Sequence, residues 1–252
     1  MNTKRFCFST ITFGLLVSQL AFAQAQQTPA AGARGQAPPA PPVVAREAPA
    51  GPKQPMSFFV TSAGLGKGGN LGGVQGADRH CQALASAVGA GNRTWHAYLS
   101  VTDLNGKGSI NARDRIGQGP WYNAKGVRIA RNVEDLHSDN SNIYRETALT
   151  EKGDVIPARP NTHDIITGST PDGRAWDFHL LDSLNLDDYA MTCKNYTSDA
   201  EEGQVMVGHM DRSGTAPISP WNAAHPSVGC SQAKIESTGS AGFLYCFAID
   251  AN

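Results

Sequence analysis

Histidine and carboxylate side chains that could act as acid–base groups recur in three short segments of the second half of the chain. These segments are His163-Asp164, His209-x-Asp211-Arg212 and His225. Acid–base catalysis uses such groups, but it also needs a nucleophile or a metal site beside them. The sequence contains neither a G-x-S-x-G motif nor an H-E-x-x-H motif. We therefore interpret these histidines as structural hydrogen-bonding groups and predict a protein that is not an enzyme and has no metal ligands.

A second chemistry is suggested by tryptophans that stand close to amide side chains, in Trp121-Tyr122-Asn123 and in Trp221-Asn222. An indole ring can stack on the apolar face of a sugar while amides and carboxylates bond its hydroxyls. The alternative is that both tryptophans belong to the hydrophobic core. On the first interpretation, Trp221 would stack on the ligand and Asn222 would donate and accept hydrogen bonds.

Acidic segments raise the question of calcium. Asp103–Asp114 has the length of an EF-hand loop, but Lys107 stands at its fifth position and its last residue is shorter than glutamate, so we predict a polar turn. Further carboxylates cluster at Asp182, Asp187 and Asp188, and at Asp199, Glu201 and Glu202. Such clusters are more often solvated surfaces. We predict no cofactor, with calcium as the alternative.

Three regions of different composition divide the chain. Residues 1–23 combine Lys4 and Arg5 with a short apolar run and an A-x-A site, as a cleaved signal peptide does, and that run is too short to span a bilayer. Residues 24–55 are rich in Ala, Pro and Gln, which predicts a disordered linker. Residues 56–252 are long enough for one domain with a hydrophobic core. We predict no membrane span after signal cleavage.

The charge of the predicted domain limits its partners. Residues 56–252 contain 16 Lys+Arg and 21 Asp+Glu, a formal charge of −5 that the basic leader and linker mask in the whole chain. A mildly acidic domain without a basic stripe is not expected to bind nucleic acid or anionic lipid. We expect the protein to be secreted, periplasmic or located at the cell surface.

Four cysteines remain once the predicted signal peptide, which contains Cys7, is removed. An even number in an exported chain indicates disulfides, and wide spacings without a C-x-x-C motif disfavour zinc. Four cysteines allow three pairings. We favour Cys81–Cys246 with Cys193–Cys230, a long outer bridge around a short inner one.

Hydrophobic periodicity predicts one early helix and several short strands. The helix is expected over 77–88, with Cys81 on its buried face, where it could meet the closing strand. Strands are expected at 56–61, 95–101, 163–168, 174–178, 191–196, 205–209 and 243–247. The turn Thr170–Gly173 predicts a hairpin between its two flanking strands, and the G-x-G-x-x-G match at Gly64–Gly69 predicts a plain loop. The expected class is α+β, with long loops that carry the surface chemistry.

These features together resemble the C-type-lectin-like fold, and more narrowly its bacterial endostatin-like branch, whose secreted members are often labelled lectins. The matching stretches are FFVTSAGLGKGGNLGGVQGADRHCQALA, NARDRIGQGPWYNAKG, HDIITGSTPDG and WNAAHPSVGCSQ…GFLYCFA. The resemblance implies one or two helices, short antiparallel strands, and the same two disulfides. Calcium-dependent sugar-binding members carry Glu-Pro-Asn or Gln-Pro-Asp and then Trp-Asn-Asp, whereas this chain has Thr170-Pro171-Asp172 and Trp221-Asn222-Ala223.

We predict an exported, non-catalytic recognition domain that binds carbohydrate. The candidate ligand-binding residues are Asp172, Asp211, Arg212, Trp221 and Asn222. Asp172 would accept hydroxyl protons, and Arg212 would pair with an acidic sugar or protein. One alternative is an adhesin for extracellular host or matrix protein, to which the endostatin-like relatives are linked. Another is an envelope enzyme on the same fold, which would need a free thiol or a metal.

Overall fold

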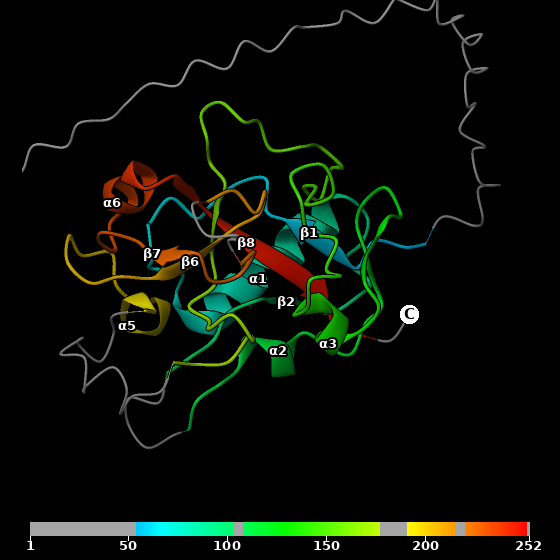
Figure 1. Cartoon of the computed structure of the whole chain (residues 1–252), viewed down its shortest axis with the longest axis horizontal. Coiled ribbons are helices and arrows are strands. Elements are labelled where there is room, and N and C mark those ends of the chain that lie inside the picture. The colour runs from blue at the N-terminus through cyan, green and yellow to red at the C-terminus, as the bar shows by residue number, and fades with distance from the viewer. Residues whose placement is uncertain (1–53, 103–107, 177–190, 215–219, 251–252) are drawn as a thin grey trace, which may run out of the picture. The chain divides into compact units, whose positions relative to one another are not determined.

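The C-terminal strand β8 (Ser240–Ala248) lies in the middle of the domain, as the computed structural model in Figure 1 shows. It pairs antiparallel with β1 (Phe58–Val60) and β2 (Trp95–Ala97), and parallel with β5 (Asp164–Ile166). The end of the domain is thus paired with its first strand.

The structure describes residues 54–102, 108–176, 191–214 and 220–250. The predicted signal peptide and nearly all of the predicted linker lie outside these ranges. So do the first half of the Asp103–Asp114 segment and the acidic residues Asp182, Asp187 and Asp188. No helix in the described ranges is long and apolar enough to cross a membrane.

The main sheet contains six strands in the order β1-β8-β5-β6-β7, with β2 paired to β8. β6 (Met206–His209) runs antiparallel to β5, and β7 (His225–Pro226) runs antiparallel to β6. The other elements are the two-stranded sheet of β3 (Trp121–Tyr122) and β4 (Arg128–Ala130), the helix α1 (Gly73–Ala87), and the short helices α2 (Ala112–Arg115), α3 (Val133–Leu136) and α6 (Gln232–Ser237). The predicted α+β class is confirmed. The expectation of antiparallel strands is wrong in one place, because β5 pairs with β8 in parallel.

Alternating side chains of β8 serve two hydrophobic cores, because successive residues of a strand point to opposite faces of the sheet. Cys246 and Ala248 pack in the core that contains the buried side of α1. Tyr245 and Phe247 pack in a second core, where the Phe247 ring lies 5.3 Å from that of Trp121. Each large apolar side chain buried in this way contributes about 2 to 3 kcal/mol.

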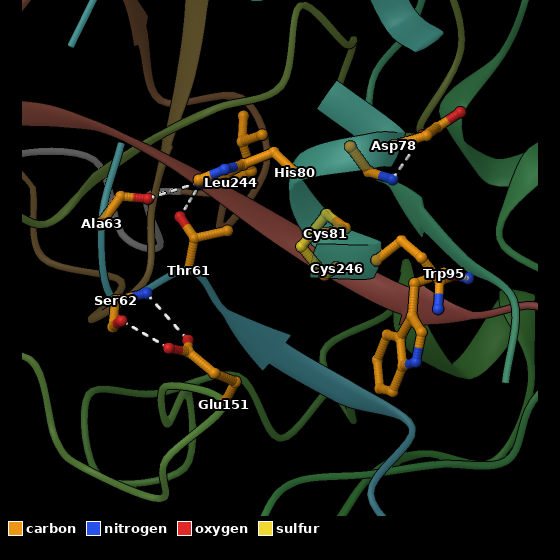
Figure 2. The surroundings of a disulfide bond; sticks show 12 residues. Thr61, Ser62, Ala63, Asp78, His80, Cys81, Trp95, Glu151, Leu244 and Cys246 are labelled. Carbon is orange, nitrogen blue, oxygen red and sulfur yellow. Dashed lines mark hydrogen bonds between the residues drawn. A yellow bond between two sulfur atoms is a disulfide. The ribbon is translucent and has the colours of Figure 1, made fainter. Parts of the chain in front are cut away.

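The disulfide Cys81–Cys246 joins α1 to β8, as Figure 2 shows. Its Cα atoms are 5.7 Å apart, as are those of the second disulfide, Cys193–Cys230. Both predicted pairings are confirmed, and two disulfides indicate an oxidising compartment. The predicted helix start at 77 is four residues late, because α1 begins at Gly73 with a glycine-containing first turn. Gly76 is required there, since a Cβ would lie 1.9 Å from the Leu71 carbonyl oxygen.

The segment predicted as a strand at 191–196 forms a left-handed turn instead, α5 (Cys193–Tyr196). All four of its residues have positive φ, between 48° and 64°. Residues other than glycine adopt this backbone conformation only where surrounding contacts stabilise it. The Asn195 side chain supplies such support by bonding both backbone groups of Thr102. The Tyr196 hydroxyl adds a 2.6 Å hydrogen bond to the Ser100 carbonyl.

The turn predicted at Thr170–Gly173 is present and is closed by a 2.9 Å hydrogen bond from the Gly173 amide to the Thr170 carbonyl. The hairpin predicted around this turn is not formed by the described residues. β5 pairs with β6 and β8 and not with the chain after the turn. Ile165 and Ile166 are fully buried, so their strand takes an inner place in the sheet. Phe178 lies outside the described residues.

A buried hydrogen-bond network ties this turn to the core. The Asn222 amide group donates to the Tyr98 hydroxyl at 2.9 Å and to the Pro171 carbonyl at 3.1 Å. His137 bonds the Val133 carbonyl through Nδ1, so its Nε2 accepts the Tyr98 hydroxyl proton at 2.7 Å. Burial raises the pKa of Tyr98 and lowers the pKa of His137, which favours the neutral form of both groups.

We expect Asn222→Ala to lower the free energy of unfolding by about 2 to 4 kcal/mol, because it removes a buried hydrogen bond to the Tyr98 hydroxyl and two part-buried ones to the Thr170 and Pro171 carbonyls. Urea denaturation monitored by circular dichroism measures the change. Asn140→Ala, at an exposed position, is the matched control and should stay within about 0.5 kcal/mol of the wild type. An Asn222→Ala protein as stable as this control would contradict the structural role.

Candidate metal centre

The register of three neighbouring strands brings the histidines of distant segments around one carboxylate. Asp164 in β5 lies directly opposite His209 in β6, so both side chains point to the same face of the sheet. His225 in β7 pairs with Val207, two residues before His209 in β6. His225 and His209 are therefore diagonal neighbours on that face.

Three imidazole nitrogens lie within 3.5 Å of the Asp164 carboxylate. His209 Nε2 is 3.2 Å and His163 Nε2 is 3.3 Å from Oδ1, and His225 Nε2 is 3.5 Å from Oδ2. Two ligands of one tetrahedral zinc ion, each bound at about 2.1 Å, are about 3.4 Å apart. The spacing between Asp164 and its histidines therefore matches that between ligands of a shared metal ion.

The Asp164 side chain has no exposed surface, and both of its oxygens lack a hydrogen-bond partner with acceptable geometry among the described residues. The same holds for the buried Nε2 of His209. The three contacts are thus short enough for ion pairs but are not aligned as hydrogen bonds. A buried carboxylate without well-aligned hydrogen bonds is energetically costly, and a cation placed between these atoms would offset that cost.

The other nitrogen of each ring is held by a hydrogen-bond acceptor. His209 Nδ1 donates to the Ser213 carbonyl, and His225 Nδ1 lies 3.0 Å from the Pro226 carbonyl. A carbonyl can only accept, so in both neutral rings the proton is on Nδ1 and the lone pair is on Nε2. Metal-binding histidines usually have this second-shell arrangement.

His163 is oriented by a different partner, the carboxylate of Asp211. His163 Nδ1 lies 3.0 Å from Asp211 Oδ1, which also accepts the Ser213 hydroxyl at 2.7 Å, while Arg145 pairs with the other oxygen. Burial alone would raise the pKa of Asp211, but the hydrogen bonds from Ser213 and His163 outweigh it and lower that pKa. Ser213 and Asp211 contact the same ring nitrogen, so the three residues are not arranged as a Ser–His–Asp triad, which needs both.

Two sets of three potential ligand atoms, each set lying within 4.8 Å, occur among the residues that the structure describes. They are Asp164 with His209 and His225, and Asp211 with His163 and His209. Asp199, Glu201 and Glu202 are exposed and form no such set there. Each set contains two histidines and one aspartate. Such ligands suit zinc or a similar transition metal, whereas calcium binds oxygen ligands.

The residues predicted to bind carbohydrate do not gather at one exposed site. Trp221 is 4% exposed and donates through its indole nitrogen to the Leu136 carbonyl, and Asn222 is 1% exposed. Arg212 bonds the Ile143 and Ser141 carbonyls. The Asp172 side chain is 55% exposed and lies beside Arg174.

Trp221 and Trp121 are therefore core residues, the alternative that the sequence had left open. Asp211 is the one candidate ligand-binding residue that lies in the histidine cluster, where it contacts His163. Comparison with models of known protein families finds no match for the chain, and comparison with curated protein sequences finds none either. The endostatin-like resemblance stays a prediction.

The metal-free centre should show a pH-dependent stability that depends on Asp164. Burial alone would lower the pKa of His209, but contacts with Asp164 and the Ser213 carbonyl outweigh it and raise that pKa. A histidine whose folded pKa is raised contributes stability at pH values below its unfolded pKa of about 6.5, and this contribution is lost as pH rises.

In chelator, we therefore expect Asp164→Asn to become more stable relative to the wild type as pH rises from about 5 to about 9. Urea denaturation across this range measures the difference in free energy of unfolding. Asp154→Asn, at an exposed position, is the control and should follow the wild type throughout. A constant difference between Asp164→Asn and the wild type would contradict the coupling.

Proposed function

We propose that this chain is an exported metal-binding domain that holds one zinc-type divalent ion between Asp164, His209 and His225. The observation that carries the proposal is the fully buried Asp164 carboxylate, which makes no hydrogen bond of acceptable geometry among the described residues although three imidazole nitrogens lie within 3.5 Å of it. Two neutral histidines and one carboxylate bind zinc or iron(II) in many proteins.

Export of the domain is part of the proposal. The predicted signal peptide and the two disulfides support an oxidising, extracytoplasmic location. The endostatin-like, C-type-lectin-like fold assignment also stays within the proposal and is supported by the sequence stretches and by the disulfide pattern. Because Cys81, Cys193, Cys230 and Cys246 are paired, the alternative of an envelope enzyme would depend on the metal.

The protein without its signal peptide should bind one equivalent of Zn²⁺, measured by calorimetry after chelator treatment. His209→Ala and His225→Ala should each weaken binding by more than about 100-fold, because each removes a ligand rather than a second-shell contact. At a free zinc concentration of 1,000 times the dissociation constant, wild-type stability should rise by about 4 kcal/mol.

His80→Ala is the matched control for these variants. His80 is partly exposed in α1 and bonds the Ala63 carbonyl at 2.8 Å (Figure 2), and its loss should leave zinc affinity unchanged. Equal zinc affinity of His80→Ala, His209→Ala and His225→Ala, or no binding by the wild type, would refute the proposed site.

The second candidate function is recognition of carbohydrate, or of an extracellular protein in the adhesin alternative. It is favoured by the turn at Thr170–Gly173. The buried Asn222 amide donates a hydrogen bond to the Pro171 carbonyl in this turn, and the Asp172 carboxylate is exposed on it. Arg174 lies 2.9 Å from that carboxylate, and Arg113 donates to the Asp172 carbonyl. A rigid turn with both charges suits the recognition of polar ligands.

A glycan array screened with residues 56–252, with and without chelator, tests this candidate. If the turn binds sugar directly, we expect signal in both conditions, and Asp172→Asn should reduce it at least about tenfold, as one lost charged hydrogen bond does. The control Asp154→Asn should retain the signal. An array without signal in either condition would end the carbohydrate proposal and direct the search to protein ligands.

A further inference from the structure

We propose that the metal at this centre has three protein ligands, not four, and that a carboxylate from an external ligand completes its coordination. The inference rests on the proposed metal site. It assigns Asp164, His209 and His225 as ligands and His163 as a positioning residue. The carboxylate would belong to an acidic sugar or to a peptide.

The planes of the imidazole rings determine which histidines can share an ion. A ring nitrogen coordinates through a lone pair in the plane of its ring. The His163 and His209 rings are stacked with centroids 4.3 Å apart and planes inclined by only 16°. Nearly parallel planes meet only far from the rings, so Nε2 of both cannot point at one ion.

His209 and His225 have the opposite relationship. Their ring centroids are 5.0 Å apart and their planes are inclined by 71°, so the two planes cross close to the rings. Their Nε2 atoms approach opposite oxygens of Asp164, at 3.2 Å and 3.5 Å. The potential ligand atoms of these three residues also lie within 4.8 Å of one another, which is close enough for them to share one ion.

His163 is held away from this set by its own contacts. Its Nδ1 faces Asp211, whose carboxylate is in turn held by Ser213 and Arg145. Turning the His163 ring toward the ion would break this arrangement. In its observed position, its Nε2 lies 3.3 Å from Asp164 Oδ1 while its Nδ1 faces Asp211, so the His163 ring contacts both carboxylates.

The open coordination position would lie on the His225 side of the centre, because His225 has the most exposed side chain of the cluster. The side chains of Asp164, His163 and His209 are 0%, 13% and 10% exposed, whereas that of His225 is 37% exposed. A ligand that approaches from solvent therefore meets the ion on the His225 side. The metal is held from the other directions by buried groups.

The charge of the occupied site selects an anion. A divalent cation with one carboxylate and two neutral imidazoles leaves one positive charge, and the Asp211 charge is balanced by Arg145. A monoanion with an oxygen donor neutralises that charge, and zinc accepts carboxylate oxygen alongside imidazole nitrogen. A carboxylate is a common biological group with these properties.

Cobalt(II) substitution tests the assignment, because cobalt d–d absorption reports ligand number and type. We expect the wild-type cobalt protein to change its spectrum in a saturable way on addition of acetate. His163→Asn should bind one equivalent of metal, weakened by at most about 100-fold as for a second-shell change, and should still respond to acetate. His225→Ala should lose far more affinity.

Glucuronate and N-acetylglycine then distinguish the two sources of carboxylate, an acidic sugar and a peptide. A spectral change that saturates at a lower concentration of either compound than of acetate supports the proposal and identifies the source.

Three results would contradict different parts of the proposal. Absence of metal binding by the wild type overturns the metal site itself. Metal binding with a spectrum indifferent to every carboxylate overturns only the open position. A loss of affinity in His163→Asn equal to that in His225→Ala makes His163 a fourth ligand and also overturns the inference.

Discussion

The pairing of β8 with three other strands is the constraint on which the rest of the domain depends. β8 pairs with β1, β2 and β5, and its alternating side chains enter both hydrophobic cores. The disulfide from Cys246 ties α1 to the same strand. A shift of β8 by one residue would exchange its faces and move every aromatic side chain out of its core. The register of β8 therefore fixes the register of its neighbours.

The position of Asp164 follows from that register. β5 lies between β8 and β6, and the Asp164 backbone bonds the Gly239 carbonyl and the Ser240 side chain at the start of β8. These contacts hold a carboxylate at a place without solvent access, which core packing alone would not favour. The strands that create this burial also deliver His209 and His225 to it. The strand pairing that buries the Asp164 carboxylate is thus also what places the two histidines beside it.

Local patterns in the sequence were enough to predict the closing strand and the buried face of α1, whereas the disulfide pairing was one of three possibilities, favoured and also implied by the endostatin-like resemblance. They failed where tertiary contacts decide the conformation. Asn195 and Tyr196 stabilise a left-handed turn through partners about a hundred residues away in the sequence. β5 pairs with β6 and β8 and does not form the predicted hairpin with the chain after the turn. The members of the histidine cluster were each visible in the sequence as acid–base candidates. Their grouping was not, because it depends on the β5–β6–β7 order, which no local spacing encodes.

The same distinction explains why Trp221, a ligand candidate in the sequence, is a buried residue in the structure. Trp221 and Asn222 stand together in the sequence, but they face β6 so closely that a Cβ at Gly208 would lie 1.8 Å from the Trp221 carbonyl oxygen. An aromatic and an amide at such a contact serve packing and hydrogen bonding, as Asn222 does below the Thr170–Gly173 turn. Buried polar groups with every partner satisfied stabilise a fold. Asp164, whose buried oxygens lack such partners among the described residues, is where a bound ion would be stabilised instead.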